Sequence, residues 1–214
     1  LTDWEYSSGK DIAGVVQNLG NGVYQGKVTI LRAAEFTLDV QVEEISITGS
    51  PYSTLTVTPA EVYAPQSVAD SAPTTAVSGT TTTFQIQGRD FYGNNALTLI
   101  SSVSSTTVQL RDASTGATVV TGSIVDDGGN TGVYNVSFTP TLSGDHHLFV
   151  LIEGLNVSGS PFEIFIDSEA TTDLTLTTIP EFPTAYQTGD YLEFTIEARD
   201  ASGNLRTSST SEVF

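Results

Sequence analysis

The chain has 214 residues, of which 25 are Asp or Glu and only 7 are Lys or Arg, so its formal net charge is −18. Polyphosphate and anionic lipid surfaces are bound through basic side chains, and this balance therefore argues against nucleic-acid binding and direct membrane adhesion. The chain contains no cysteine, which excludes disulfides, thiol catalysis and cysteine-ligated metals.

Alternation of apolar and polar residues dominates the chain and predicts β-strands, whereas no segment shows a helical period. In the middle of the chain we expect strands over 65–70, 81–89, 106–111, 118–125, 132–139, 145–152 and 157–166. Clusters of Gly, Asn, Asp and Ser separate these runs and predict turns. Short strands at this spacing are typical of an antiparallel sandwich, so the fold class is all-β.

Sequence motifs recur at a fixed interval of 110 residues. Gly-Ser-Pro followed by an aromatic residue occurs at 49–52 and 159–162, Gly-Val-Tyr at 22–24 and 132–134, and Arg-Asp at 89–90 and 199–200. A fixed interval indicates an internal repeat. We expect one complete repeat between two incomplete ones, with the C-terminal part of a repeat at 1–58, a complete repeat at 59–168 and the N-terminal part of the next at 169–214.

The order of these motifs resembles the filamin-type immunoglobulin-like repeat. The similarity rests on Asp-Asp-Gly-Gly-Asn at 126–130, the strand 134–140, Gly-Asp-His-His at 144–147, Gly154 and Gly-Ser-Pro-Phe-Glu-Ile at 159–164. It implies a seven-strand sandwich that is used in tandem arrays as a spacer, crosslinker or adhesion stalk. The first copy departs from this pattern, with Glu44 in place of Gly154 and Ala34 in place of Gly144.

The resemblance also implies that a partner strand can add along the edge formed by the third and fourth strands. Backbone hydrogen bonds would then supply affinity, and alternate side-chain pockets selectivity. The alternative is an ordinary edge strand protected by its neighbours. The residues concerned are Thr107, Val108, Gln109, Val119, Val120 and Thr121.

Two glycosylation sequons begin at Asn135 and Asn156. Alternation directs Tyr134, Val136 and Phe138 inward, which leaves Asn135 on the outer face. Asn156 lies beside a turn. Both side chains could carry glycans without disturbing the core if the chain is secreted.

The acidic segment 126–130 could be a calcium loop, because carboxylates and glycine bends suit oxygen-ligated cations. Its counterpart at 16–20 has no carboxylate, however, and a β-hairpin turn explains both copies. His146 and His147 are adjacent in a strand and should face opposite sides, so a packing role is favoured over one metal site. No catalytic signature, phosphate loop or cofactor motif is present, so we expect neither an enzyme nor a cofactor.

These observations predict a non-enzymatic structural array that forms an extended extracellular or cell-surface fibre or adhesion stalk. Its partners would be neighbouring repeats or copies of itself, with a protein partner added by β-augmentation as a further option. Residues 211–214 followed by 1–3 read like the segment 108–112 of the complete repeat. This fit suggests that the chain is the repeating unit of a filament, with Phe214 continuing into another Leu1. The alternative is a cytoplasmic filamin-like crosslinker or scaffold that binds partner strands at a sheet edge.

Overall fold

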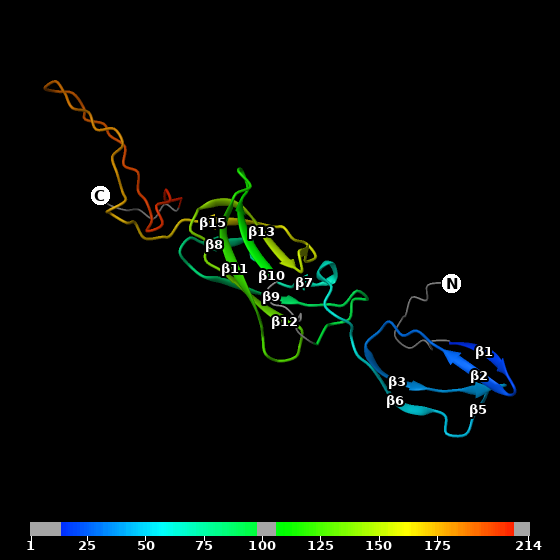
Figure 1. The fold of residues 1–214 in the computed structure, drawn as a ribbon. Helices are drawn as coiled ribbons and strands as arrows, with labels where there is room; N and C mark the ends of the chain where they lie inside the picture. The colour runs from blue at the N-terminus through cyan, green and yellow to red at the C-terminus, as the bar shows by residue number, and fades with distance from the viewer. Residues whose placement is uncertain (1–13, 98–105, 208–214) are drawn as a thin grey trace. The chain divides into compact units, whose positions relative to one another are not determined.

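The computed structural model describes residues 14–97 and 106–207. It divides the chain into two compact units, 1–60 and 61–214, and almost all of its regular structure is β-strand (Figure 1). Within the described residues, no helix is long and apolar enough to cross a membrane. Leu1 and Phe214, whose continuity the filament hypothesis requires, both lie outside the described residues.

The second unit contains a β-sandwich and one 3-10 turn, η1 (Ala64–Gln66). Its strands are β7 (Val68–Ala69), β8 (Thr75–Val77), β9 (Thr82–Gln87), β10 (Thr106–Asp112), β11 (Thr118–Asp126), β12 (Val133–Phe138), β13 (Gly144–Ile152), β14 (Leu155–Asn156) and β15 (Phe162–Asp167). The all-β immunoglobulin-like sandwich expected from the sequence is therefore confirmed.

Hydrogen bonding joins these strands in the order β7-β9-β12-β11-β10-β13-β15-β8, with β14 paired to β13. Strand β11 belongs to both layers, because its first half pairs with β10 and its second half with β12. The change falls at Gly122, where a Cβ atom would lie only 2.4 Å from the carbonyl oxygen of Ser137. A side chain at this position would therefore prevent the strands from approaching.

The first strand of the sandwich differs from the single strand expected at 65–70. Strand β7 pairs antiparallel with β9, whereas β8 pairs parallel with β15. Between them lies Pro73, which has no N–H group to give to a sheet. The chain thus leaves one layer and enters the other, and each layer receives a short edge strand.

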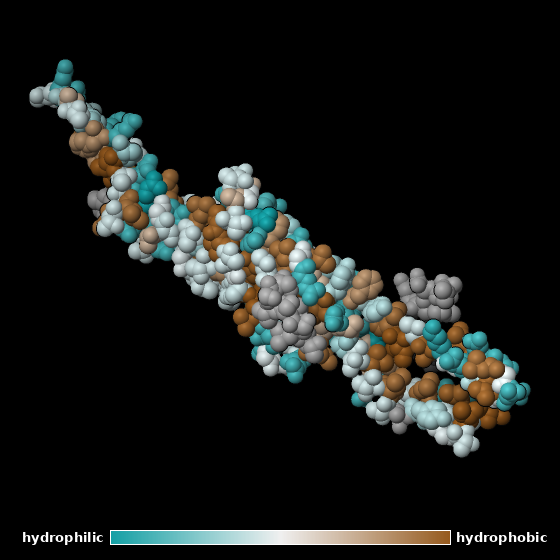
Figure 2. Space-filling model, viewed as in Figure 1, coloured by the Kyte–Doolittle hydropathy of each residue, from teal (hydrophilic) through white to brown (hydrophobic). Residues whose placement is uncertain are grey.

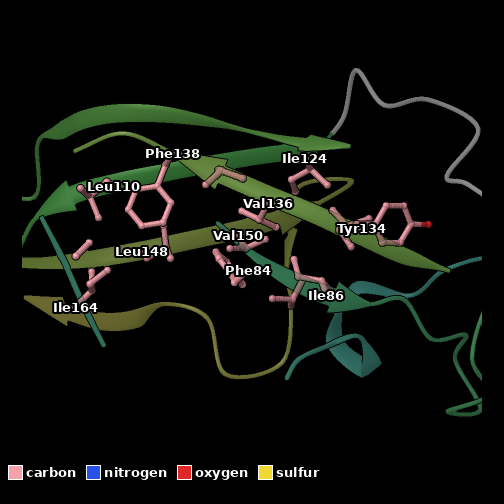
Figure 3. Packing of buried hydrophobic residues seen from close by; sticks show 14 of the residues in the cluster. Phe84, Ile86, Leu110, Ile124, Tyr134, Val136, Phe138, Leu148, Val150 and Ile164 are labelled. Carbon is pink, nitrogen blue, oxygen red and sulfur yellow. The ribbon is translucent and has the colours of Figure 1, made fainter. Parts of the chain in front are cut away.

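The core of the sandwich consists of side chains that alternate along the strands, as Figure 3 shows. In β12, Tyr134, Val136 and Phe138 are buried, and in β13 every second residue from His146 to Ile152 is buried. These side chains meet the apolar residues of β9, β10 and β15. Because the chain has no disulfide, this packing and the strand hydrogen bonds hold the sandwich together.

Over its described residues, the first unit forms three antiparallel strand pairs: β1 (Val15–Gly20) with β2 (Val23–Lys27), β3 (Ala34–Leu38) with β6 (Tyr52–Val57), and β4 (Gln41–Val42) with β5 (Ile45–Ser46). Strands β5 and β6 begin and end 110 residues before β14 and β15, the interval of the sequence repeat. The Ser-Pro peptide bond before β6 is cis, as is the one before β15. The repeated motifs therefore form the same local structures in both units.

The two departures from the filamin pattern have different outcomes in the structure. Glu44 has φ of 64° and Gly154 has φ of 77°, so the turn between β4 and β5 keeps the left-handed backbone of its counterpart. A residue with a Cβ atom adopts this conformation at a cost of roughly 1–2 kcal/mol. At the second departure, Ala34 begins β3 just as Gly144 begins β13.

Apolar side chains of the first unit lie on its surface, and Figure 2 shows them gathered over its strands. Val16 and Ile45, for example, are 70% and 71% exposed. In the segment 169–207 of the second unit, which contains isolated bridges but no strand, Tyr191 is 93% exposed. Both regions expose side chain types that a complete sandwich would bury.

Candidate functional site

The residues expected to form a partner-strand edge lie in two different environments. Thr107, Val108 and Gln109 belong to β10, which is hydrogen-bonded to β13 on one side and to β11 on the other. Val119, Val120 and Thr121 lie in the first half of β11, which pairs with β10 and, among the described residues, with no strand on its other side. Any partner strand would therefore add to β11, and its binding remains a prediction.

Both sequon asparagines lie on the surface of the sandwich. Asn135 lies in β12 and Asn156 in β14, and both are exposed. The Oδ1 atom of Asn135 accepts a hydrogen bond of 3.1 Å from Gln85, and that of Asn156 accepts one of 3.4 Å from Ser160. In each case the bonded atom is the oxygen, and the nitrogen is the atom to which a glycan is attached.

The acidic segment 126–130 forms the turn between β11 and β12. Asp126 accepts the N–H of Gly128 at 2.7 Å, and Asp127 accepts the N–H of Gly129 at 2.9 Å and the hydroxyl of Thr131 at 2.7 Å. These bonds lower the pKa of Asp127, chiefly through the N–H of Gly129. The carboxylates therefore already stabilise their own turn, and the described residues contain no group of three potential metal ligands.

The two histidines face opposite sides of β13, as alternation predicted. His146 is 1% exposed, whereas His147 is partly exposed. The Nδ1 atom of His146 lies 2.9 Å from the carbonyl oxygen of Gly144, to which it donates when it carries the proton. Its Nε2 atom is buried and has no hydrogen-bond partner among the described residues. His146 is therefore a packing residue of the core.

Two hollows lie on the described surface. One, of about 240 Å³, is lined by Asp70, Ser71, Phe84, Gln85, Gln87 and Val133. The other, of about 1170 Å³, is an open groove in the segment 180–195, where Phe182 and Phe194 have ring centroids 5.8 Å apart.

The repeated Arg-Asp motif opens a turn of sequence Asp-x-x-Gly-Asn, which occurs at 90–94 and 200–204. Asp90 Oδ1 accepts the N–H groups of Tyr92 and Asn94, each at 2.9 Å. Asp200 Oδ1 accepts those of Ser202 and Asn204 at 3.0 and 2.8 Å. In both copies the asparagine Nδ2 also donates to the aspartate carboxylate. The turn is thus built in the same way twice.

In the second copy, the side chain of this asparagine reaches the sandwich. Asn204 Nδ2 donates to Ser78 Oγ at 2.9 Å and to the carbonyl oxygen of Thr141 at 3.0 Å. Its Oδ1 accepts the N–H of Ser143 at 3.0 Å. Ser78 is fully buried and Asn204 is 7% exposed, so these polar groups meet away from solvent. The repeated Arg-Asp pair in the sequence marks the position of this turn but not the residues that it contacts.

Acid should destabilise the second unit below about pH 4. Burial alone would raise the pKa of Asp200, but hydrogen bonds from the Asn204 side chain and from the N–H groups of Glu169, Asn204 and Ser202 lower it overall. Hydrogen bonds from Ser114 and Thr115 lower the pKa of Asp112 as well. A carboxyl group whose folded pKa is depressed stabilises the fold above its unfolded pKa, and this contribution is lost as the pH falls through the folded value.

Chemical denaturation at about pH 5 and pH 3 checks this expectation, with a lower free energy of unfolding at the lower pH. In Asp200→Asn, the difference between the two pH values should be smaller, because one titrating carboxylate has been removed. Equal unfolding free energies at the two pH values in the unaltered chain would contradict the prediction.

The family model of the Filamin/ABP280 repeat matches residues 57–163, half of the chain. The chain belongs to the filamin repeat family. The match includes η1 and all strands of the sandwich from β7 to β14, together with the start of β15. This confirms the resemblance drawn from the motifs. A comparison of the sequence with curated proteins finds no match.

Several solved structures resemble this filamin-type chain. FdeC, an adhesin of Escherichia coli, has a TM-score of 0.52 at 19% identity, and the match covers 90% of this chain and 59% of the adhesin chain. The Lin-41 filamin domain has a TM-score of 0.40 at 22% identity, covering 50% of this chain and 97% of that domain. Invasin, a bacterial integrin-binding protein, has a TM-score of 0.46 at 16% identity, and the match covers 89% of this chain and 32% of the invasin chain. The filamin-type chain thus spans little more than half of the FdeC chain, with which it shares the fold.

Proposed function

We propose that this chain is part of a non-catalytic array of filamin-type repeats that serves as an extended fibre or adhesion stalk outside the cell or on its surface. One observation carries the proposal: the motifs that recur at 110 residues also form strands with the same bounds, β5 and β6 in the first unit and β14 and β15 in the second. A sequence that rebuilds the same sandwich elements at a fixed interval is suited to linear extension, with stability approximately the sum of domain and interface contributions.

The charge of the chain supports such an array. A net charge of −18 keeps neighbouring repeats soluble and mutually repelled, which favours an extended over a collapsed arrangement. Partners in this proposal are neighbouring repeats or further copies of the chain. They would cover apolar side chains of the first unit and of the segment 169–207, such as Val16 and Leu174, which are 70% and 76% exposed.

The second part of the proposal is that the array lies outside the cell or on its surface. Its support is the strongly acidic composition and the two exposed sequons, in β12 and β14 of the second unit. The fold is one that the adhesin FdeC also uses. The sandwich contains no disulfide, and its core is built mainly from apolar side chains, with the buried His146 among them.

Protease treatment of intact source cells tests this setting. We expect an antibody epitope in the second unit to be lost before the cells are lysed, with a cytoplasmic enzyme as the control for intact membranes. Mass spectrometry of the native protein then examines the peptides that contain Asn135 and Asn156, and glycan mass on either would place the chain in a secretory route. An epitope that is protected until lysis would contradict the extracellular fibre.

A cytoplasmic crosslinker is the second candidate, and one observation favours it: over Thr118–Gly122, the side of β11 away from β10 pairs with no strand among the described residues. Val119 and Val120 there are partly buried against the core, so an added strand could bond to the backbone without repacking the sandwich. This candidate predicts protection from protease in intact cells and unmodified Asn135 and Asn156. The same experiment therefore separates the two functions.

A further inference from the structure

We propose that the Asp-x-x-Gly-Asn turn is a docking element that fixes each repeat to the repeat before it, with the asparagine side chain setting their relative orientation. The partner is thus the end of the preceding sandwich in the same chain. This inference rests on the proposed array of consecutive repeats, and it adds how each repeat is held to the one before it. It makes the junction a defined polar interface rather than a flexible link.

The turn at 199–204 forms one side of this interface and is held by its own hydrogen bonds. Asp200 is fully buried and accepts the N–H groups of Ser202 and Asn204, and the backbone N–H of Asp200 donates to the carbonyl oxygen of Asn204 at 3.0 Å. Arg199 donates to the carbonyl oxygen of Gly203 at 2.8 Å. These bonds hold Asn204 in one position, so little conformational freedom remains to be lost on docking.

The other side of the interface is the end of the sandwich around Ser78, Thr141 and Ser143, and it matches both ends of the asparagine amide. The Asn204 Nδ2 atom meets two acceptors, Ser78 Oγ and the Thr141 carbonyl, while its Oδ1 atom meets one donor, the Ser143 N–H. Ser78 is itself positioned by donating to the Thr141 carbonyl at 3.1 Å. A buried polar group that loses its partner is destabilising, and this complementarity therefore selects an amide of this length in one orientation.

The linker between the sandwich and the turn, which includes Ser168 and Glu169, also takes part in this interface. Asp200 Oδ2 accepts the Glu169 N–H at 3.0 Å, and Ser168 Oγ accepts the N–H of Thr207 at 3.0 Å. A Cβ atom on Gly79, whose φ is +74°, would lie 1.9 Å from a carboxylate oxygen of Glu169. The linker thus lies against the end of the sandwich at Gly79 and is hydrogen-bonded to the turn segment at Asp200 and Thr207, which restricts its swing.

One sandwich carries both halves of the interface, at opposite ends of one strand. Ser78 precedes β9 and belongs to the sandwich side of the interface. The turn at 90–94 follows β9 and repeats the sequence pattern and internal hydrogen bonds of the turn at 200–204. Six extended residues separate the two ends by about 20 Å. An interface whose two halves lie at opposite ends of a unit joins units head to tail, which gives an open array when the rotation between units does not close a ring.

Amide hydrogen exchange of the full chain, followed by NMR, tests the proposal. In Asn204→Ala, the Ser143 amide loses its acceptor and should exchange about fivefold faster, the effect of one hydrogen bond. Ser202→Ala is the matched control, because it changes an exposed side chain of the same turn and keeps the Ser202 N–H that Asp200 accepts. The Leu148 amide in β13 should be unaffected in both variants, which shows that the sandwich remains folded.

Residual dipolar couplings provide the second measurement. Amides of 199–205 and of β13 should fit one alignment tensor in the unaltered chain and in Ser202→Ala, and two in Asn204→Ala. Unchanged Ser143 exchange in Asn204→Ala, or two independent tensors in the unaltered chain, would overturn the docking role. Neither result would contradict the proposed surface location of the array, because protease accessibility on intact cells tests that location separately.

Discussion

Replacing Leu148 with alanine should lower the free energy of unfolding of the second unit by about 2–5 kcal/mol, because the substitution removes buried methyl groups and leaves a cavity. Leu148 is fully buried in the middle of β13, opposite Leu110 of β10 and Phe162 of β15. The surrounding strands pair on both sides of β13 and cannot collapse easily into the space. The cost should therefore approach the upper part of this range.

Urea denaturation followed by far-ultraviolet circular dichroism measures the change. Leu155→Ala is the control, since Leu155 lies in the neighbouring strand β14 but is 48% exposed, and its replacement should cost less than about 1 kcal/mol. If the two variants unfold at the same urea concentration, β13 is not the centre of the core. An unchanged m value in Leu148→Ala would show that the variant still unfolds from a complete sandwich.

The sandwich could be predicted because its signals are local. Strands β12 and β13 alternate in burial as they do in sequence, as Tyr134, Val136 and Phe138 show in β12. The division of the first strand could not be predicted from alternation, because the choice between layers depends on which neighbour is within reach after Pro73. Likewise, the resemblance placed β10 at an edge, and only the strand pairing shows β13 on its other side.

The docking contact of Asn204 was beyond sequence reasoning for a different reason. Its partner Ser78 lies 126 positions away in the chain, and its two other partners are backbone groups of Thr141 and Ser143, which leave no mark in the residue types. What the sequence did contain was the second occurrence of Asp-x-x-Gly-Asn. A polar turn that recurs with its internal bonds intact indicates a structural role, but its partner becomes visible only in three dimensions.

The second large effect is expected for Gly132→Ala, at the repeated Gly-Val-Tyr motif. The residue has φ of +70°, and a Cβ atom there would lie 1.7 Å from the carbonyl oxygen of Ala96. The contact is with backbone, which cannot rotate away as the end of a side chain would. The carbonyl oxygen of Gly132 also accepts the Gly88 N–H at 2.7 Å, and Ala96 is fully buried.

The expected loss is about 2–4 kcal/mol, from the left-handed backbone and from overpacking together. Gly128→Ala separates the two causes: Gly128 has φ of +81°, yet no atom lies within 4 Å of its Cβ position, so only the backbone cost of about 1 kcal/mol applies. Urea denaturation of both variants gives the difference. Equal losses of unfolding free energy in the two variants would mean that the segment around Ala96 moves aside freely. The close approach of Gly132 would then not fix the start of β12.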